Sequence, residues 1–193
     1  MRALIVALLI AAAGLALGGA SAWYTIARSQ GFGAITIGPW TAIPFAGAGE
    51  IDPYTIAKSV IEGSVPLGAS EGLAFNAVTD SDGRELTMRC DYEIEGATPA
   101  ARLWTLVAYG ADGRPAQPAQ GGVAALWSGA ALRYPDGSFR ISVSRHPRPG
   151  NWLALASGGP LRLTLRLYDT PVTGGSSLIN PRMPSIRRGD CLP

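Results

Sequence analysis

The amino-acid sequence predicts a mainly β protein, a jelly-roll-like antiparallel β-sandwich with one short helix, preceded by an N-terminal transmembrane helix. Three observations support this prediction. An uncharged apolar run opens the chain, 25 glycines and 15 prolines supply frequent turns, and later segments alternate between apolar and polar residues. Short alternating segments joined by turns are typical of sandwiches and barrels.

The segment Ala3–Ala27 has no charged side chain and no polar helical face. As an α-helix it would be about 37 Å long, enough to cross a hydrocarbon core of about 30 Å. Arg2 favours a cytoplasmic N-terminus, and Trp23 and Tyr24 fall where aromatic residues gather at the far interface. We therefore expect a single-pass inner-membrane protein with its domain facing the periplasm.

A cleaved secretory signal is the alternative for residues 1–30. Ala20-Ser21-Ala22 has the small-residue pattern that a signal peptidase accepts, and cleavage near Ala22 would give a secreted or periplasmic protein. Residues 31–50 are rich in Gly, Pro and Ala and are expected to form a juxtamembrane linker, with one short strand at Ala34–Ile37. Residues 51–193 are expected to form the β-sandwich.

One helix is predicted over Pro53–Glu62. Asp52 is a good N-cap, Pro53 suits the first helical turn, and Gly63 is a suitable end. The apolar residues of this helix form one stripe, made of Ile56, Ala57, Val60 and Ile61.

The rest of the domain has the period-two alternation of half-buried strands. Strands are predicted over Leu73–Thr79, Glu85–Glu95, Leu103–Tyr109, Phe139–Ser144 and Leu161–Tyr168, and about seven or eight are expected in total. Asp80–Gly83 is a turn sequence between the first two strands. The stretch Asp169–Pro193 is expected to be mostly irregular. The predicted core consists of Phe75, Trp104, Leu106, Phe139, Ile141, Val143, Leu163 and Leu165.

The chain has two cysteines, Cys90 and Cys191. An exported domain lies in an oxidising compartment, so these two are expected to form a disulfide. The alternative is two separate thiols.

Composition and motifs exclude several classes of function. The residues after Phe32 carry equal numbers of basic and acidic side chains, which is a poor match for nucleic acid. No dinucleotide or P-loop glycine motif is present, so no cofactor is predicted. With one histidine and two distant cysteines, no metal site is predicted either.

Three polar groups are candidates for catalytic or metal sites. His146 with Ser144 and Asp136 could be imagined as a hydrolase triad, but no nucleophile-elbow motif exists and a histidine in a Pro-rich turn is the better interpretation. Asp80 and Asp82 lack the glutamate that closes a calcium loop and favour a hairpin turn. The acidic residues Asp91, Glu93 and Glu95 share one strand face, which favours a solvated surface over an acidic site.

Several blocks in order give the chain a family resemblance. They are Asp52-Pro53-Tyr54, Cys90-Asp91-Tyr92, Ala101–Leu106 with Tyr109, Asp136-Gly137-Ser138, Gly150–Leu153, Leu165–Tyr168 and Met183–Ile186. They resemble the domain-of-unknown-function family 1214. Ala154 and Thr170 depart from its pattern, which affects the expected loop shapes. The resemblance implies an all-β, jelly-roll-like domain of exported or envelope proteins and brings no established activity.

Two classes of function stay open. The first is a binding or assembly module of the cell envelope, with an envelope protein or a glycan as partner. The second is a hydrolase or lyase acting on an envelope polymer or glycan, carried by a carboxylate pair such as Glu71 and Asp80. For the binding module, one face open to an acidic or glycan-like partner is predicted from Arg102, Asn151, Trp152, Arg166 and Tyr168. The alternative is that Arg166 pairs internally with Glu71 or Asp91 and that Trp152 belongs to the core.

Overall fold

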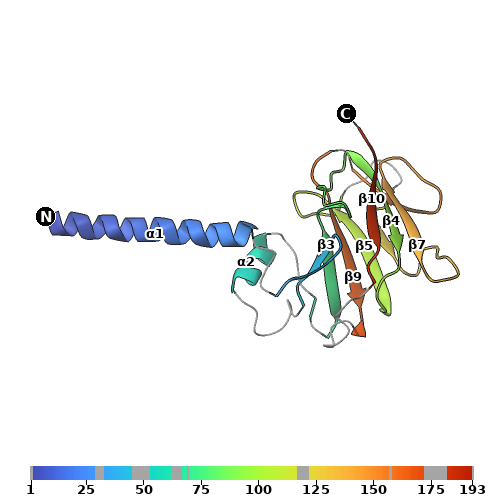
Figure 1. Ribbon diagram of the computed structural model, residues 1–193, viewed down its shortest axis with the longest axis horizontal. Coiled ribbons are helices and arrows are strands. Elements are labelled where there is room, and N and C mark those ends of the chain that lie inside the picture. Colours follow the sequence, from blue (N-terminus) through green and yellow to red (C-terminus); the bar gives the residue numbers. More distant parts are fainter. Residues whose placement is uncertain are drawn as a thin grey trace.

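The computed structural model describes residues 2–28, 33–44, 53–61, 67–68, 70–116, 122–156, 158–171 and 182–192. A long helix, α1, projects from a β domain, and a short helix, α2, lies beside the C-terminal end of α1 (Figure 1). The elements are α1 (Arg2–Arg28), β1 (Ile35–Ile37), β2 (Trp40–Ala42), α2 (Pro53–Ile61), β3 (Gly72–Ala77), β4 (Cys90–Gly96), β5 (Leu103–Tyr109), β6 (Ala125–Trp127), β7 (Phe139–Ser144), β8 (Asn151–Ala154), β9 (Arg162–Tyr168) and β10 (Ser185–Cys191).

The described strands form two sheets that pack face to face. The six-stranded sheet has the order β1-β2-β3-β9-β5-β6, and the four-stranded sheet has the order β10-β4-β7-β8. All pairs are antiparallel except β7 with β8, which run parallel. The prediction of a mainly antiparallel β-sandwich is confirmed.

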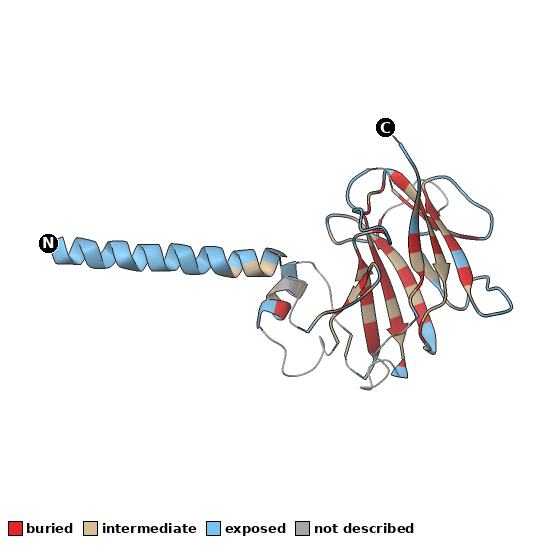
Figure 2. Cartoon of the chain, in the orientation of Figure 1, coloured by how far each residue is buried: buried red, intermediate tan, exposed pale blue. Residues whose placement is uncertain are grey.

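The core lies between the two sheets, where one side of each strand is buried (Figure 2). Alternation explains this, because successive side chains of a strand point to opposite faces. All eight predicted core residues are buried: Phe75, Trp104, Leu106, Phe139, Ile141, Val143, Leu163 and Leu165. Trp104 and Phe139 come from different sheets, and their ring centroids are 5.1 Å apart.

The helix α1 is long and apolar enough to cross a membrane. Its 27 residues span about 40 Å at the helical rise, more than the hydrocarbon thickness of about 30 Å. Almost all of its described side chains are exposed (Figure 2), and the half-buried ones, Ala22, Thr25 and Ile26, belong to its last turns. An apolar helix without a polar face requires an apolar environment around it.

Part of the expected linker belongs to the sheet. β1 and β2 form a hairpin that pairs with β3, where Thr41 lies opposite Asn76. Trp40 is fully buried, and its indole donates a hydrogen bond of 2.7 Å to the carbonyl of Pro184. Burial of this large ring explains why residues expected as a linker form an edge of the six-stranded sheet.

Two further expectations about the strands are corrected. Ser185–Cys191 is a strand rather than irregular, because it pairs with β4 and buries Ile186 against Ile94. The predicted strand Glu85–Glu95 begins only at Cys90. The residues before it turn back, and the Tyr92 hydroxyl holds this turn by accepting from the Thr87 amide at 2.8 Å.

The predicted disulfide is confirmed, since Cys90 and Cys191 are bonded and lie opposite each other in β4 and β10. The bridge therefore closes a loop with a sequence separation of 101 residues. The helix α2 starts at Pro53 as predicted and ends at Ile61. The expected N-cap Asp52 and helix end Gly63 lie outside the described residues.

Candidate functional site

The five residues predicted to share one face lie on two different sheets. Arg166 and Tyr168 are in β9 of the six-stranded sheet, and Arg102 immediately precedes β5 beside them. Asn151 and Trp152 are in β8 of the four-stranded sheet. The structure therefore brings three of them together and separates the other two, and the binding role of all five stays a prediction.

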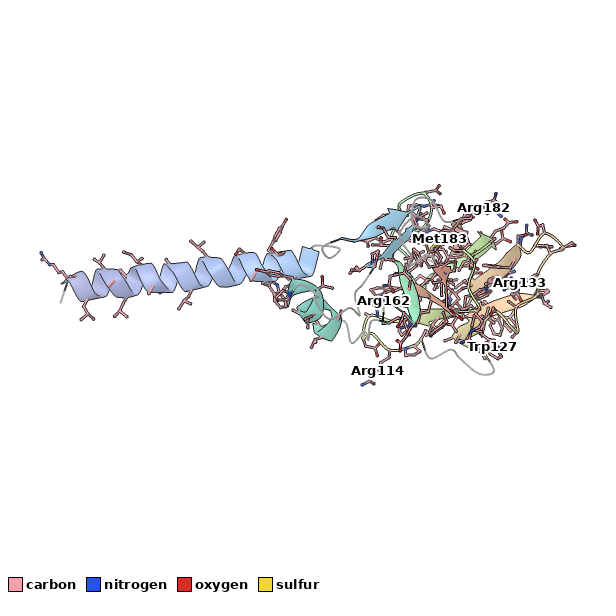
Figure 3. The ribbon with its side chains drawn as sticks, turned by 90° about the horizontal axis from the view of Figure 1, so that it is seen from below. Arg114, Trp127, Arg133, Arg162, Arg182 and Met183 are labelled. Carbon is pink, nitrogen blue, oxygen red and sulfur yellow. A yellow bond between two sulfur atoms is a disulfide. The ribbon has the colours of Figure 1, made fainter. Side chains whose placement is uncertain are left out.

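The outer side of the six-stranded sheet carries a cluster that we call the aromatic–arginine face. The strand register places Arg166 beside Thr105 and Thr105 beside Trp127, while Arg162 lies opposite Tyr109. Arg162 lies on the side of the domain nearer α2, and Trp127 lies farther from it (Figure 3). The face consists of Tyr109, Trp127, Arg162, Arg166 and Tyr168, none of which is fully buried.

Charge is distributed unevenly between the two sheets. The six strands of the larger sheet contain no Asp or Glu, and their two charged residues are Arg162 and Arg166. Every strand carboxylate among the described residues belongs to the four-stranded sheet. The aromatic–arginine face is therefore cationic, with no compensating acid on its own strands.

Tyr109 contacts both arginines of this face. The Arg166 Nη1 donates a hydrogen bond of 2.9 Å to the Tyr109 hydroxyl. The guanidinium carbons of Arg162 and Arg166 also lie 5.3 Å and 5.6 Å from the centroid of the Tyr109 ring, within cation–π range. The Tyr109 side chain therefore contacts both arginines, and its hydroxyl does not neutralise the charge of Arg166.

Arg166 does not pair with either carboxylate considered in the sequence analysis. The Glu71 carboxylate accepts from the Gly68 amide at 3.0 Å, and the Asp91 carboxylate pairs with Arg148 at 3.0 Å. A guanidinium has five N–H donors, and in the described part of the chain the Tyr109 hydroxyl is the one hydrogen-bond acceptor for Arg166. This half-buried cation keeps donors available for an anion.

Arg102 and Tyr168 lie where the face meets the end of the sheet. The Arg102 amide donates to the Tyr168 carbonyl at 3.1 Å, which joins the start of β5 to the end of β9. The Arg102 side chain pairs with Asp169 at 3.2 Å, and both side chains are largely exposed. Such a pair contributes little to stability, so Arg102 is held loosely at the rim.

Asn151 and Trp152 have structural contacts instead. The buried Asn151 amide accepts from the Leu132 amide at 2.7 Å and donates to the carbonyls of Leu132 and Arg140. It thereby attaches the loop before β7 to β8. Trp152 is half-buried, and its indole donates to the carbonyl of Ser144 at 3.1 Å. These bonds give the side-chain amide of Asn151 three backbone partners, so its burial needs no ligand.

The outer side of the four-stranded sheet carries an ion-pair network instead. Arg140 and Arg187 each lie within 2.9 Å of both Glu93 and Glu95, so the two cations and two anions compensate one another. The hydrogen bond from Arg140 lowers the pKa of the Glu95 carboxyl. The acidic side chains of β4 are therefore neutralised by arginines, namely Arg140 and Arg187 of the neighbouring strands and Arg148, the partner of Asp91.

Asp80 belongs to a structural turn. Its buried carboxylate lies 2.9 Å from the Arg84 side chain and 3.1 Å from that of Arg188, and it accepts from the backbone amides of Asp82 and Arg84. Burial raises the pKa of Asp80, but the hydrogen bonds from Arg84 and Asp82 outweigh it and the net pKa is lowered. With both oxygens occupied, Asp80 fits the predicted hairpin turn rather than a calcium loop.

The catalytic pairs considered in the sequence analysis are not assembled. Glu71 and Asp80 flank opposite ends of the six-residue β3, which separates them by about 20 Å, whereas glycosidase carboxylates lie about 5–10 Å apart. The Ser144 hydroxyl donates to the backbone carbonyl of His146 at 2.7 Å. Among the described residues, no group of three or more His, Cys, Asp and Glu side chains could hold a metal ion.

A separate cavity of about 690 Å³ is lined mainly by apolar residues and glycines, together with the acidic residues Glu85 and Asp112. It is formed where the β3–β4 turn meets the loop after β5 and the start of β9, and Ile61 of α2 contributes to its wall. Its volume lies in the range of small-molecule sites. Its apolar lining includes Ile61, Val78, Leu86, Pro160 and Leu161, with Arg162 at the edge that it shares with the aromatic–arginine face.

The sequence reasoning missed Tyr109, Trp127 and Arg162 as members of the site. The signal for Arg162 was available, because alternation in β9 places it on the same side as Arg166 and Tyr168. Tyr109 and Trp127 come from other strands, and only the sheet order β9-β5-β6 shows that they are neighbours.

Comparison with solved structures finds two proteins similar to this chain, and the first of them has the same fold. The VPA0106 protein from Vibrio parahaemolyticus is 20% identical, with a TM-score of 0.55, over 72% of this chain and 36% of that one. A putative uncharacterized protein from Burkholderia cenocepacia is 22% identical, with a TM-score of 0.45, over 68% of this chain and 33% of that one. The chain thus spans about a third of each solved protein.

No match was found among curated protein sequences. A family model described as "Protein of unknown function (DUF1214)" matches residues 71–172, more than half of the chain. This match agrees with the resemblance seen in the sequence blocks. The chain belongs to the DUF1214 family.

Proposed function

We propose that this protein is a single-pass inner-membrane protein whose β-sandwich faces the periplasm and binds an acidic, glycan-like ligand of the cell envelope through the aromatic–arginine face. The proposal places α1 in the membrane as a retained anchor. Arg2 at the start of α1 favours a cytoplasmic N-terminus. The Cys90–Cys191 disulfide fits an oxidising compartment for the domain.

The observation that carries the binding proposal is Arg166, a half-buried guanidinium oriented by Tyr109 and without a carboxylate partner in the described part of the chain. A guanidinium fork recognises carboxylates and phosphates through paired hydrogen bonds. The exposed Trp127, two strands away from Arg166 in the same sheet, adds apolar area to this face. Together they suit a polymer that presents both acidic groups and sugar rings.

The catalytic alternative has less support. A hydrolase or lyase acting on a glycan requires an acid and a base at close range, and Glu71 and Asp80 lie at opposite ends of β3. The strand carboxylates Glu93 and Glu95 each form ion pairs with two arginines, so their oxygens already have partners. The binding module is therefore the function that the geometry favours.

Titration of the full-length protein in detergent with a uronic-acid polymer, polygalacturonate, tests the binding face, with neutral dextran as the comparison. Arg166→Gln should weaken polygalacturonate binding by about 10- to 100-fold, the equivalent of about 1.5–3 kcal/mol for hydrogen bonds to a charged group. Arg187→Gln, which removes an exposed arginine of the other sheet, is the matched control and should bind as the wild type does.

The binding result can contradict the proposal in two ways. Either the wild-type protein binds dextran and polygalacturonate equally, or folded Arg166→Gln binds polygalacturonate as tightly as wild type. Circular dichroism establishes that the variant is folded. A third outcome is that the wild-type protein does not bind polygalacturonate but captures a protein from a membrane extract, and that Arg166→Gln does not capture it. The partner is then an envelope protein, and a glycan ligand is excluded.

The anchor is tested separately by N-terminal sequencing of protein extracted from membranes. A retained anchor gives a sequence that starts at or next to Met1, whereas a mature chain that starts at Trp23 would refute it. Digestion of spheroplasts with an added protease tests the orientation. A periplasmic domain is degraded in intact spheroplasts, and a protected domain would contradict the proposed topology.

A further inference from the structure

The apolar stripe of α2 faces outward instead of into the sandwich. The exposed side chains Tyr54, Ile56, Val60 and Ile61 lie on one side of this nine-residue helix at 100° per residue. Thr55, on the opposite side, is the buried residue, at 3% exposure against 75% for Val60. A soluble domain usually buries the apolar side of an amphipathic helix, so the orientation of α2 is the reverse of the usual one.

The position of α2 along α1 indicates what covers this stripe. α2 contacts α1, beside its C-terminal end (Figure 1). The half-buried residues of α1 are Ala22, Thr25 and Ile26, which share one helical side by their spacing. Trp23 and Tyr24 are exposed in the same turns of α1. Aromatic rings of this kind mark the depth of the membrane–water interface, so α2 lies at that depth.

We propose that α2 lies in the membrane–water interface beside the anchor, with its apolar side chains among the lipid headgroups and upper acyl chains. This inference rests on the proposed membrane insertion of α1. Short helices with one apolar side bind bilayers in this orientation, with the apolar side buried about 5–10 Å deep. Ile61 also lines the cavity, so that part of the cavity wall would lie close to the bilayer.

An environment-sensitive fluorophore on single cysteines tests this placement in the full-length protein. Both native cysteines are in the disulfide, so an introduced cysteine is the single free thiol. Ile56→Cys and Val60→Cys report the apolar side, and Ser59→Cys, a half-buried position on the opposite side, is the comparison. Leu15→Cys, in the middle of α1, reports whether the anchor itself is inserted. Each labelled variant is reconstituted into vesicles of phosphatidylethanolamine and phosphatidylglycerol.

The expected result is a blue-shifted emission at positions 56 and 60, with stronger quenching by headgroup-labelled nitroxide lipids than at position 59. If positions 56 and 60 are quenched no more than position 59 while position 15 is quenched by deep nitroxide lipids, the inference fails and the anchor stands. If position 15 is not quenched either, the anchor and the inference both fail. The labelled sites at 56 and 60 are exposed, so the labels should leave the packing of α2 intact.

Discussion

The disulfide should be the largest single contribution to the stability of the β domain. Replacing both Cys90 and Cys191 with alanine opens a loop with a sequence separation of 101 residues. In the chain-entropy description, a bridge that closes a loop of about 100 residues stabilises the folded state by about 4.7 kcal/mol, and measured losses are commonly about 2–5 kcal/mol. β10 keeps its pairing with β4 and its buried Ile186, so the variant should still fold.

Urea unfolding of the full-length protein in detergent, followed by tryptophan fluorescence, measures this loss. Trp40 and Trp104 are buried in the core, so their emission reports unfolding of the domain. The double variant and reduced wild-type protein should unfold at a similar, lower urea concentration. Adding reductant to the double variant is the control and should change nothing. Equal midpoints for oxidised and reduced wild-type protein would refute the reasoning.

Two further predictions concern stability. Asp80→Asn should lower the free energy of unfolding by about 1.5–3 kcal/mol, because Arg84 loses a buried charged acceptor. The pKa of Asp80 is lowered from 3.8 in the fold, so its contribution is complete above that pH and is lost as the pH falls further. Unfolding at pH 2–5 should therefore show a steeper loss for wild type than for Asp80→Asn, and equal slopes would contradict this. Gly72→Ala should lower the free energy of unfolding far more than Gly137→Ala does. An added Cβ at Gly72 would lie 1.9 Å from the Leu167 carbonyl oxygen, whereas Gly137→Ala costs about 1 kcal/mol of backbone strain alone. Thermal melts compare the two, and similar melting temperatures would contradict the close contact.

The strands that were predicted well from sequence alone are those in which apolar and polar residues alternate. In Arg162–Tyr168 and Phe139–Ser144 the alternating apolar residues are all buried, and the polar Thr164 and Ser144 are the further buried positions. The core follows from this pattern, because period-two alternation defines which side of a strand is apolar. No long-range information is required for that step.

The strand Ser185–Cys191 was missed for the opposite reason. It contains one buried apolar residue, Ile186, among charged and small ones, so its sequence has no alternation to detect. Its stability comes from partners far along the chain. These are the backbone of β4, the bridge to Cys90 and the Ser81 hydroxyl, which accepts from the Ile186 amide at 2.9 Å. Contacts of this kind cannot be deduced from a local pattern.

The candidate site was only partly predictable because it depends on sheet order. Alternation placed Arg166 and Tyr168 on one side of their strand, but nothing local indicates that the Tyr109 hydroxyl accepts a hydrogen bond from Arg166. The same limit explains why Trp152 was grouped with Arg166, although they lie in different sheets. The apolar stripe of α2 was identified correctly in sequence, yet its pattern does not say whether protein or lipid covers it.

The residues that complete the sandwich lie partly outside the family match. Residues 71–172 contain β3 to β9, but the hairpin β1–β2 and the edge strand β10 lie beyond it on either side. Both flanks meet where the Trp40 indole binds the Pro184 carbonyl. Without them Cys90 loses its partner, and Ile94 loses the cover of Ile186. The β1–β2 hairpin is thereby attached to the strand that the disulfide holds, so both flanks of the family match complete one core.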